Sequence, residues 1–289
     1  MSIPGFSAHV EPLNGTEIAW SMGGSGPPLL LLHGFPQTRA LWARLGPELA
    51  RTHTVICPDL RGYGASAKPD AVAAYSFRQM ARDQIALLDH LHLGPVAVAG
   101  HDRGARVAHR MALDHPEAVS RLVLMDIVPT HTLLSDLSQD VARAYYHWFF
   151  LAQPAPLPER LIGSDRDLYF ESCLNGWGRA GLSQFDPQQL AAYRQAWSDP
   201  DTIRGMCNDY RATLEHDQHI DAADLGTKIS CPTLILFGAD GVMGQLYDIP
   251  ACWAAVCTHM TDLAVPGGHF FVDTHPAETL HALTGFLDT

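Results

Sequence analysis

Three residues with the chemistry of a nucleophile, a supporting acid and a base occur along the chain in the order Asp102, Asp126 and His269. Asp102 is the centre of residues 100–104 (GHDRG), the G-x-nucleophile-x-G pattern of a nucleophile elbow, with aspartate in the place of the usual serine. Such an elbow turns a strand sharply into a helix and presents its central side chain above the sheet. The apolar run 96–99 before the pattern and the helical spacing after it are the context that an elbow requires.

An aspartate nucleophile predicts displacement at a saturated carbon, because a carboxylate is already ionised at neutral pH and needs no base before it attacks. The product of that attack is an ester on Asp102. Water activated by His269, which Asp126 would hold in the right tautomer, is expected to hydrolyse this ester. The backbone N–H groups of Phe35 and Arg103 are expected to bind the oxyanion that forms during hydrolysis.

Asp240 is the alternative to Asp126 as the supporting acid. It follows Gly238 in the loop after the next strand, where this fold often places its acid. The usual spacing puts the acid three residues after that glycine, and this position is Gly241 here. We therefore predict Asp126 as the acid.

Two arginines beside the nucleophile indicate an anionic substrate. Arg103 and Arg106 are three residues apart in the first turn of the expected helix and so face nearly the same way. Paired guanidinium groups bind a carboxylate with paired hydrogen bonds, and a helix N-terminus also favours an anion. The alternative for Arg106 is a solvated helix face or an ion pair with an acid such as Asp114.

The elements that must position these residues alternate between strand and helix, which predicts a doubly wound parallel sheet whose strand ends carry the ligand chemistry. Helices are expected over about 40–50, 77–91, from the elbow to about 115, and 276–287. A proline- and aromatic-rich stretch interrupts the alternation, so we predict a helical cap at residues 129–224 between two parts of the sheet domain, 1–128 and 225–289. The expected strands are 6–10, 17–21 (paired through an Asn-Gly turn), 29–32, 53–57, 96–99, 120–125, 231–238 and 259–265.

Composition excludes several classes of function. The net charge of −12 argues against nucleic acid or an anionic membrane as a partner, so a pocket for an anion must carry local positive charge. The six cysteines show no C-x-x-C spacing, which predicts reduced thiols in a cytoplasmic protein and neither a zinc site nor a disulfide framework. No apolar run approaches the ~18 residues of a membrane helix, and no signal peptide is expected.

The sequence resembles the fluoroacetate dehalogenases of the α/β-hydrolase fold. The resemblance covers nearly the whole chain and is carried by the elbow and by residues 33–36 (HGFP), 110–116 (RMALDHP), 147–151 (HWFFL) and 266–273 (PGGHFFVD). It implies a mostly parallel eight-stranded sheet with helices on both faces, an inserted helical cap, no metal or other cofactor, and a homodimer. It also implies a small haloacid substrate, whose carboxylate Arg103 and Arg106 bind while Asp102 attacks.

The resemblance further implies that His147, Trp148 and Tyr210 hold the departing halide. From the residues alone, the aromatic run 145–150 is typical of a cap core, although each of these three side chains offers one hydrogen-bond donor in an apolar wall. The resemblance makes the halide site the favoured interpretation.

Three alternatives share the same frame. An epoxide hydrolase would use the same triad, with Tyr146 and Tyr210 protonating the epoxide oxygen, but the two arginines would then have no task. A haloacid dehalogenase that prefers chloroacetate would differ mainly in pocket volume. A non-catalytic binding protein on this fold would be expected to lack a member of the triad, and all the candidates are present.

Overall fold

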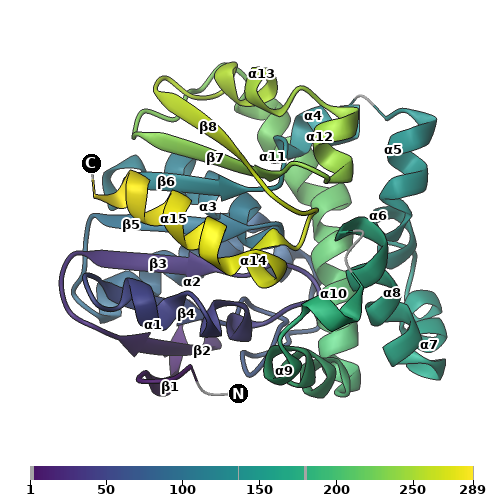
Figure 1. Ribbon diagram of the computed structural model, residues 1–289. Coiled ribbons are helices and arrows are strands. Elements are labelled where there is room, and N and C mark those ends of the chain that lie inside the picture. The colour runs from purple at the N-terminus through teal and green to yellow at the C-terminus, as the bar shows by residue number, and fades with distance from the viewer. Residues whose placement is uncertain (1–2, 136, 179–180, 289) are drawn as a thin grey trace.

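The computed structural model describes residues 3–135, 137–178 and 181–288, and these contain one sheet of eight strands in the order β1-β2-β4-β3-β5-β6-β7-β8 (Figure 1). β1 pairs antiparallel with β2, and β2 with β4, while the remaining neighbours are parallel. This topology confirms the predicted mostly parallel sheet. The strands are β1 (Ser7–Leu13), β2 (Thr16–Gly23), β3 (Pro28–Leu32), β4 (Thr54–Pro58), β5 (Val96–His101), β6 (Val119–Met125), β7 (Thr233–Gly238) and β8 (Met260–Val265).

Helices cover both faces of the sheet because alternate residues of the central strands point to opposite sides. In β3, Leu30 and Leu32 join the apolar cluster under α2 (Phe77–His90) and α3 (Arg103–Asp114). Leu29 and Leu31 join the opposite cluster, under α1 (Gly46–Leu49) and α15 (Pro276–Leu287). All four leucines are fully buried, and each contributes about 1.5–3 kcal/mol of burial free energy.

Two local expectations have different outcomes. Asn14 and Gly15 both have positive φ and close the β1–β2 hairpin, as the Asn-Gly turn predicts. The single helix expected over 40–50 is wrong. A 3₁₀ segment, η1 (Arg39–Ala43), ends before Gly46, and α1 begins there with Pro47 in its first turn. Pro47 has no N–H to continue an earlier helix, but a first turn accepts it.

Eight α-helices follow one another between β6 and β7 in the described part of the chain. Figure 1 shows α5 to α8 beyond the ends of the central strands, with α10 passing between them and the sheet. The predicted boundaries at residues 129 and 224 fall just before α4 and just after α11, and the division into domains stays a prediction. The helices are α4 (Thr130–Ser135), α5 (Gln139–Ala144), α6 (Tyr146–Leu151), α7 (Leu157–Ser164), α8 (Arg166–Gly178), α9 (Pro187–Trp197), α10 (Pro200–Ala212) and α11 (Gln218–Ala223).

The remaining short elements connect strands or carry loops of the site. They are η2 (Val72–Tyr75), η3 (Pro116–Ala118), η4 (Leu182–Gln184), the π-helical turn η5 (Thr213–Asp217), α12 (Val242–Leu246), α13 (Ile249–Ala254) and α14 (Phe271–Thr274). No helix within the described ranges is long and apolar enough to cross a membrane. All six cysteines are free thiols.

Candidate active site

The chain turns sharply at Asp102, between the last residue of β5 and the first residue of α3. Asp102 has φ 49° and ψ −115°, a strained conformation that lifts its side chain off the sheet. The two glycines of the elbow are required by close packing. A Cβ at Gly100 would lie 2.4 Å from the carbonyl oxygen of Gly104, and one at Gly104 would lie 2.4 Å from that of His33. The pattern therefore encodes an elbow, as the sequence predicts.

The Asp102 carboxylate is buried, and its two oxygens have different surroundings. Oδ2 accepts a hydrogen bond of 2.9 Å from the backbone N–H of Phe35, while Oδ1 lies 4.0 Å from Nε2 of His269. Burial alone would raise the pKa of Asp102. The nearby His269, His101, Arg103 and Arg106 outweigh burial and lower that pKa. The group is therefore ionised, with one oxygen held by an amide and the other facing the histidine.

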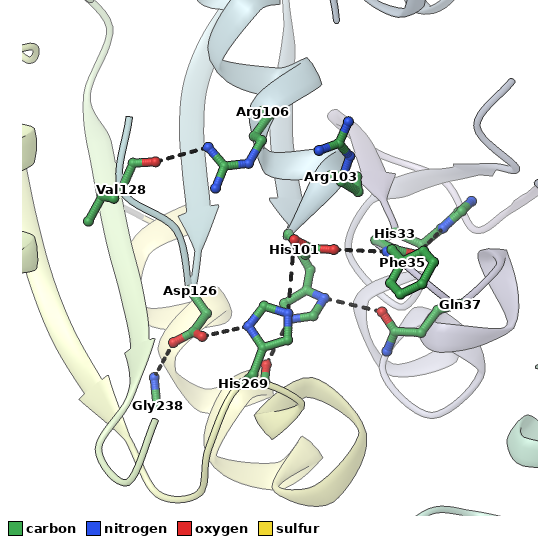
Figure 2. Close-up of polar contacts among 12 residues, drawn as sticks. His33, Phe35, Gln37, His101, Arg103, Arg106, Asp126, Val128, Gly238 and His269 are labelled. Atoms are coloured by element: carbon green, nitrogen blue, oxygen red, sulfur yellow. Dashed lines mark hydrogen bonds and ion pairs between the residues drawn. The ribbon is translucent and has the colours of Figure 1, made fainter. Parts of the chain in front are cut away.

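Asp126 and His269 form a buried hydrogen-bonded pair (Figure 2). His269 Nδ1 lies 2.6 Å from Asp126 Oδ2, and Asp126 Oδ1 accepts a hydrogen bond of 2.9 Å from the Gly238 amide. Burial opposes the charged imidazolium, but the hydrogen bond and charge of Asp126, together with the charge of Asp102, prevail and raise the pKa of His269. Because Nδ1 faces a carboxylate, it carries the hydrogen, and Nε2 is left as a base that faces Asp102.

Asp240, the alternative acid, lies in the neighbouring loop with an exposed side chain. Its backbone N–H donates to the carbonyl oxygen of Gly267. The carboxylates that lie within 4 Å of the His269 ring nitrogens belong to Asp126 and Asp102 in the described chain. The geometry thus favours Asp126 as the acid.

Arg103 is fully buried and already paired, which the sequence did not indicate. Its guanidinium donates to both carboxylate oxygens of Asp209, to Asp209 O at 3.0 Å and to Thr213 Oγ1 at 2.6 Å. Tyr63 Oη donates to the same carboxylate at 2.6 Å. The Nη1 group is left without a hydrogen-bond partner among the described residues. Arg103 therefore has only part of its guanidinium to offer a ligand.

Arg106 is buried as well but has a different environment. Its Nη1 donates to the Val128 carbonyl oxygen at 3.1 Å and to Thr130 Oγ1 at 3.0 Å, and its guanidinium lies over the Trp148 ring at 4.7 Å. Across the described ranges no carboxylate forms an ion pair with it, and Nε has no partner. Burial and the neighbouring Arg103 lower the pKa of Arg106 to about 10, so it is still charged at neutral pH. Asp114, the alternative partner, pairs with Arg78 and Arg110 instead.

The three side chains predicted to bind the halide lie close together. His147 and Trp148 come from α6 and Tyr210 from α10, and all three are buried. The Tyr210 ring lies 5.5 Å from each of the other two rings and 5.3 Å from the ring of Phe35, whose amide holds Asp102. Tyr210 Oη is buried without a hydrogen-bond partner in the described chain. Burial lowers the pKa of His147 well below its ordinary value, so its ring is neutral and has one N–H to donate.

Of the two adjacent tyrosines in the aromatic run, Tyr145 is buried and Tyr146 is not. Tyr146, a candidate proton donor of the epoxide hydrolase alternative, is 46% exposed. Tyr145 is buried, and Asp126 and Asp102 are close enough to add to the effect of burial in raising its pKa. Adjacent residues on a short helical turn point in different directions, so the run itself could not tell them apart.

The described residues contain no group of three or more His, Cys, Asp or Glu side chains arranged to hold a metal ion. What the site offers is an ionised carboxylate, an acid–histidine pair, backbone N–H groups and a buried guanidinium without a carboxylate partner. The Arg103 amide is the first N–H of α3, one of those that a helix leaves without an intrahelical acceptor, and its role as the second oxyanion donor stays a prediction. Together these groups suit displacement by Asp102 followed by hydrolysis of the ester.

Comparison with known proteins agrees with this topology. A family model described as alpha/beta hydrolase fold matches residues 27–276. The fluoroacetate dehalogenase of Burkholderia sp is 48% identical over 286 residues, covering 98% of this chain and 94% of that protein. The soluble epoxide hydrolase of Corynebacterium sp. (strain C12) is 34% identical over 271 residues, covering 93% and 92%.

Among solved structures, ALR0039 from Nostoc sp PCC 7120 superposes with a TM-score of 0.97 at 44% identity and covers 99% of both chains. The predicted resemblance is therefore confirmed over nearly the full length. The topology, the family match and these identities show that the chain belongs to the α/β-hydrolase fold family, in which it is a relative of fluoroacetate dehalogenase.

Proposed function

We propose that the protein is a hydrolytic dehalogenase of small 2-haloacids such as fluoroacetate, which it converts to glycolate and halide. The observation that carries the proposal is the ionised Asp102 beside Arg106, a buried cation that lacks a carboxylate partner in the described chain. A carboxylated substrate would supply that partner and place its neighbouring carbon at the nucleophile. The 48% identity to a fluoroacetate dehalogenase supports the same reaction.

The reaction divides into two half-reactions. Asp102 Oδ1 attacks the carbon that bears the halogen, and the electron pair of the carbon–halogen bond leaves with the halide. His269 Nε2 then takes a proton from water, whose oxygen attacks the Asp102 carboxyl carbon while the Phe35 amide binds the oxyanion at Oδ2. The tetrahedral intermediate collapses, the bond to the glycolate oxygen breaks, and that oxygen takes the proton from His269.

The cap donors have a particular task with fluoride, whose small anion demands strong solvation. Tyr210 Oη, with His147 and Trp148 beside it, would donate to the halide as its charge develops. Donors of this kind stabilise the transition state more than the bound substrate. The proposal therefore links defluorination to these three hydrogen-bond donors, which an apolar core would not require.

Removing the Tyr210 hydroxyl should test this link. In Tyr210→Phe the ring stays to pack under Arg103, whose guanidinium lies 4.2 Å from the ring centroid, while one halide donor is lost. We expect kcat for fluoroacetate to fall by ~10²-fold, about 3 kcal/mol, by analogy with an oxyanion-hole donor. The loss for chloroacetate should be smaller because chloride accepts hydrogen bonds less strongly. Tyr169→Phe removes the buried hydroxyl of a half-buried tyrosine on α8 and is the control. Equal losses on both substrates in Tyr210→Phe would contradict a halide site.

Replacing Arg106 should test substrate charge recognition. Arg106→Met keeps an apolar side chain against Trp148 but removes the guanidinium. We expect kcat/KM for haloacetates to fall by about 10- to 100-fold, the cost of a lost hydrogen bond to a charged group. Arg110→Met, one turn further along α3 and ion-paired with Asp114 and Asp224, is the control in steady-state halide-release assays. Unchanged haloacetate kinetics in Arg106→Met would show that Arg106 does not bind the substrate's carboxylate.

An epoxide hydrolase is the second candidate, favoured by the 34% identical relative and by the Tyr210 hydroxyl, which has no hydrogen-bond partner among the described residues. The exposed Tyr146 leaves that reaction without the second tyrosine that it was expected to use. Assays on fluoroacetate, chloroacetate and styrene oxide, followed by fluoride electrode, chloride release and diol formation, separate the candidates. Fluoride release with no diol supports our proposal, chloride without fluoride indicates a chloroacetate-preferring enzyme, and diol alone indicates an epoxide hydrolase.

Two finer parts of the proposal concern setting and assembly. Six free thiols support a reducing compartment, and we propose the cytoplasm. We also propose a homodimer. Large apolar side chains of α7 and α8, Leu157, Leu161 and Leu168, are each more than half exposed and would suit a contact between two copies.

A further inference from the structure

A chain of buried polar groups runs behind the site, from the cap to the loop of the catalytic histidine. Tyr193 Oη on α9 donates to Asp273 Oδ1 on α14 at 2.9 Å. The Gln37 Nε2 lies 2.5 Å from Asp273 Oδ2, and the Gln37 Oε1 lies 3.2 Å from His101 Nδ1. His101 Nε2 lies 2.8 Å from the carbonyl oxygen of His269, as Figure 2 shows.

The hydrogen atoms in this series of hydrogen bonds can be assigned by starting from the His269 carbonyl oxygen. The His269 carbonyl oxygen only accepts, so Nε2 of His101 carries a hydrogen. A neutral His101 then has a bare Nδ1, which needs a donor opposite it. Gln37 provides that donor once its amide is rotated by 180°, which exchanges the two ends so that the NH₂ group faces His101 and the carbonyl oxygen faces Asp273. Two acceptors would meet there unless Asp273 supplies a hydrogen.

We propose that Asp273 is a protonated carboxylic acid at neutral pH. Through Gln37 it selects the His101 tautomer that donates a hydrogen bond to the backbone of His269. In this state Asp273 donates to Gln37, Gln37 donates to His101, and His101 donates to the His269 carbonyl oxygen. Each of these polar groups is then paired without burying a charge. The distance of 2.5 Å between Gln37 Nε2 and Asp273 Oδ2 is short for an N–H···O bond, and an O–H···O bond from Asp273 to the rotated amide suits it better.

The surroundings of Asp273 favour the neutral form. The side chain is fully buried, and burial raises its pKa to about 7 against the opposing effects of Tyr193, Gln37 and Arg44. Asp186, at the start of α9, adds to the rise. When the Gln37 carbonyl faces the acid, Gln37 stabilises the protonated form instead and raises the pKa further. The neutral acid thus avoids the cost of a buried carboxylate without a cation.

His101 is the other place where the same proton could reside. An imidazolium there would donate from both nitrogens, and Asp273 would be ionised. Burial lowers the pKa of His101 to about 4, with His269 adding to that effect and Asp102 and Asp126 opposing it. The ring centroids of the two histidines are 4.8 Å apart, so two positive rings would repel each other. The proton therefore belongs on the carboxyl group.

The network positions the site without touching substrate. His101 precedes the nucleophile in the chain, and its hydrogen bond fixes the backbone of the catalytic base. Without the proton on Asp273, Nε2 of a neutral His101 would carry no hydrogen and would face the His269 carbonyl oxygen, so that two acceptors would meet. The expected effect of this network on halide release rests on the proposed dehalogenase function. The assignment of the proton to Asp273 does not depend on that function.

The decisive experiment compares the unfolding temperatures of the wild type and Asp273→Asn between pH 4 and 8.5. Asparagine mimics the protonated acid but cannot ionise. In the unfolded chain the pKa of this aspartate is near 3.8, so the unfolded protein releases the proton at a pH where folded Asp273 still holds it. The wild type therefore loses folding stability as pH rises from about 4 to about 7. We expect the midpoint of Asp273→Asn relative to wild type to rise across this window and to level off above it.

Asp240→Asn, the same change at an exposed position, is the control and should give a flat difference. A flat difference for Asp273→Asn as well, or a change confined to below pH 4, would overturn the proposal. Nitrogen NMR of the wild type should show His101 as the neutral Nε2–H tautomer, and an imidazolium would likewise overturn it.

Halide release tests the positioning role separately. Asp273→Asn should keep near-wild-type kcat, while Asp273→Leu, which cannot donate to Gln37, should lose activity. Equal activity of the two variants would refute the positioning role. Absence of halide release from the wild type would refute the dehalogenase but leave the pH-dependent stability difference intact.

Discussion

In the His269→Asn variant, an ester on Asp102 is expected to accumulate until every active site carries one. The first half-reaction needs no base, and although His269 no longer lowers the pKa of Asp102 in this variant, His101, Arg103 and Arg106 still do. The second half-reaction needs a base, and asparagine cannot accept the proton from water. We expect turnover to fall by at least ~10⁴-fold, the scale of losses in hydrolytic triads. Intact-protein mass spectrometry after incubation with fluoroacetate measures the adduct.

Peptide mapping should place the added mass on Asp102, and Asp102→Asn with the same substrate is the control without adduct. A single turnover of the wild type in ¹⁸O-water gives the complementary result, in which the label enters the Asp102 side chain before it reaches glycolate. Normal turnover by His269→Asn, or label passing directly into glycolate with the protein unlabelled, would exclude the ester pathway.

Asp126→Asn is expected to lower kcat by ~10⁴-fold, while Asp240→Asn retains most of the activity. An amide at residue 126 can donate to Nδ1 of His269 and so stabilise the wrong tautomer, with the hydrogen on the nitrogen that faces Asp102. The exposed Asp240 has no such contact. Steady-state halide release by the two variants measures the difference, and the reverse order of the losses would transfer the acid role to Asp240.

The pH profile gives a second measure of the same pair. His269 must be neutral to act as a base, so the rate of ester hydrolysis falls as pH drops below its pKa. Asp126 raises that pKa, and its replacement should move the acid limb of kcat to lower pH in whatever activity remains. A limb that stays in place would indicate that another group controls it.

The sequence was sufficient for the fold and for the residues that meet at the strand ends. Alternating strand and helix patterns predicted the order of elements, and parallel strands bring their carboxyl ends to one edge, so Asp102, Asp126 and His269 were expected to lie together. The helix predicted over 40–50 is wrong because Gly46-Pro47 is a local stop signal that interrupts the apolar spacing.

Contacts between distant elements could not be predicted. Asp209 stands next to a candidate halide donor in the chain, yet nothing in its neighbourhood indicates that its carboxylate binds Arg103, 106 residues away. Gln37 and Asp273 are 236 residues apart and look like ordinary loop and helix-cap residues. Their pairing depends on how the loop after β3 packs against α14, which periodicity and spacing do not describe.

The Arg103–Asp209 pair has a consequence for the ancestry and engineering of this protein. Arg103 lies on α3 and Asp209 on α10, so each of these helices carries a buried charge that only the other one balances in the described chain. Separating such a fully enclosed pair would leave a lone charge in an apolar interior, at a cost of about 3–5 kcal/mol. A cap transplanted from another hydrolase should therefore be tolerated only when it provides an acidic residue at the position of Asp209, or when Arg103 is replaced at the same time.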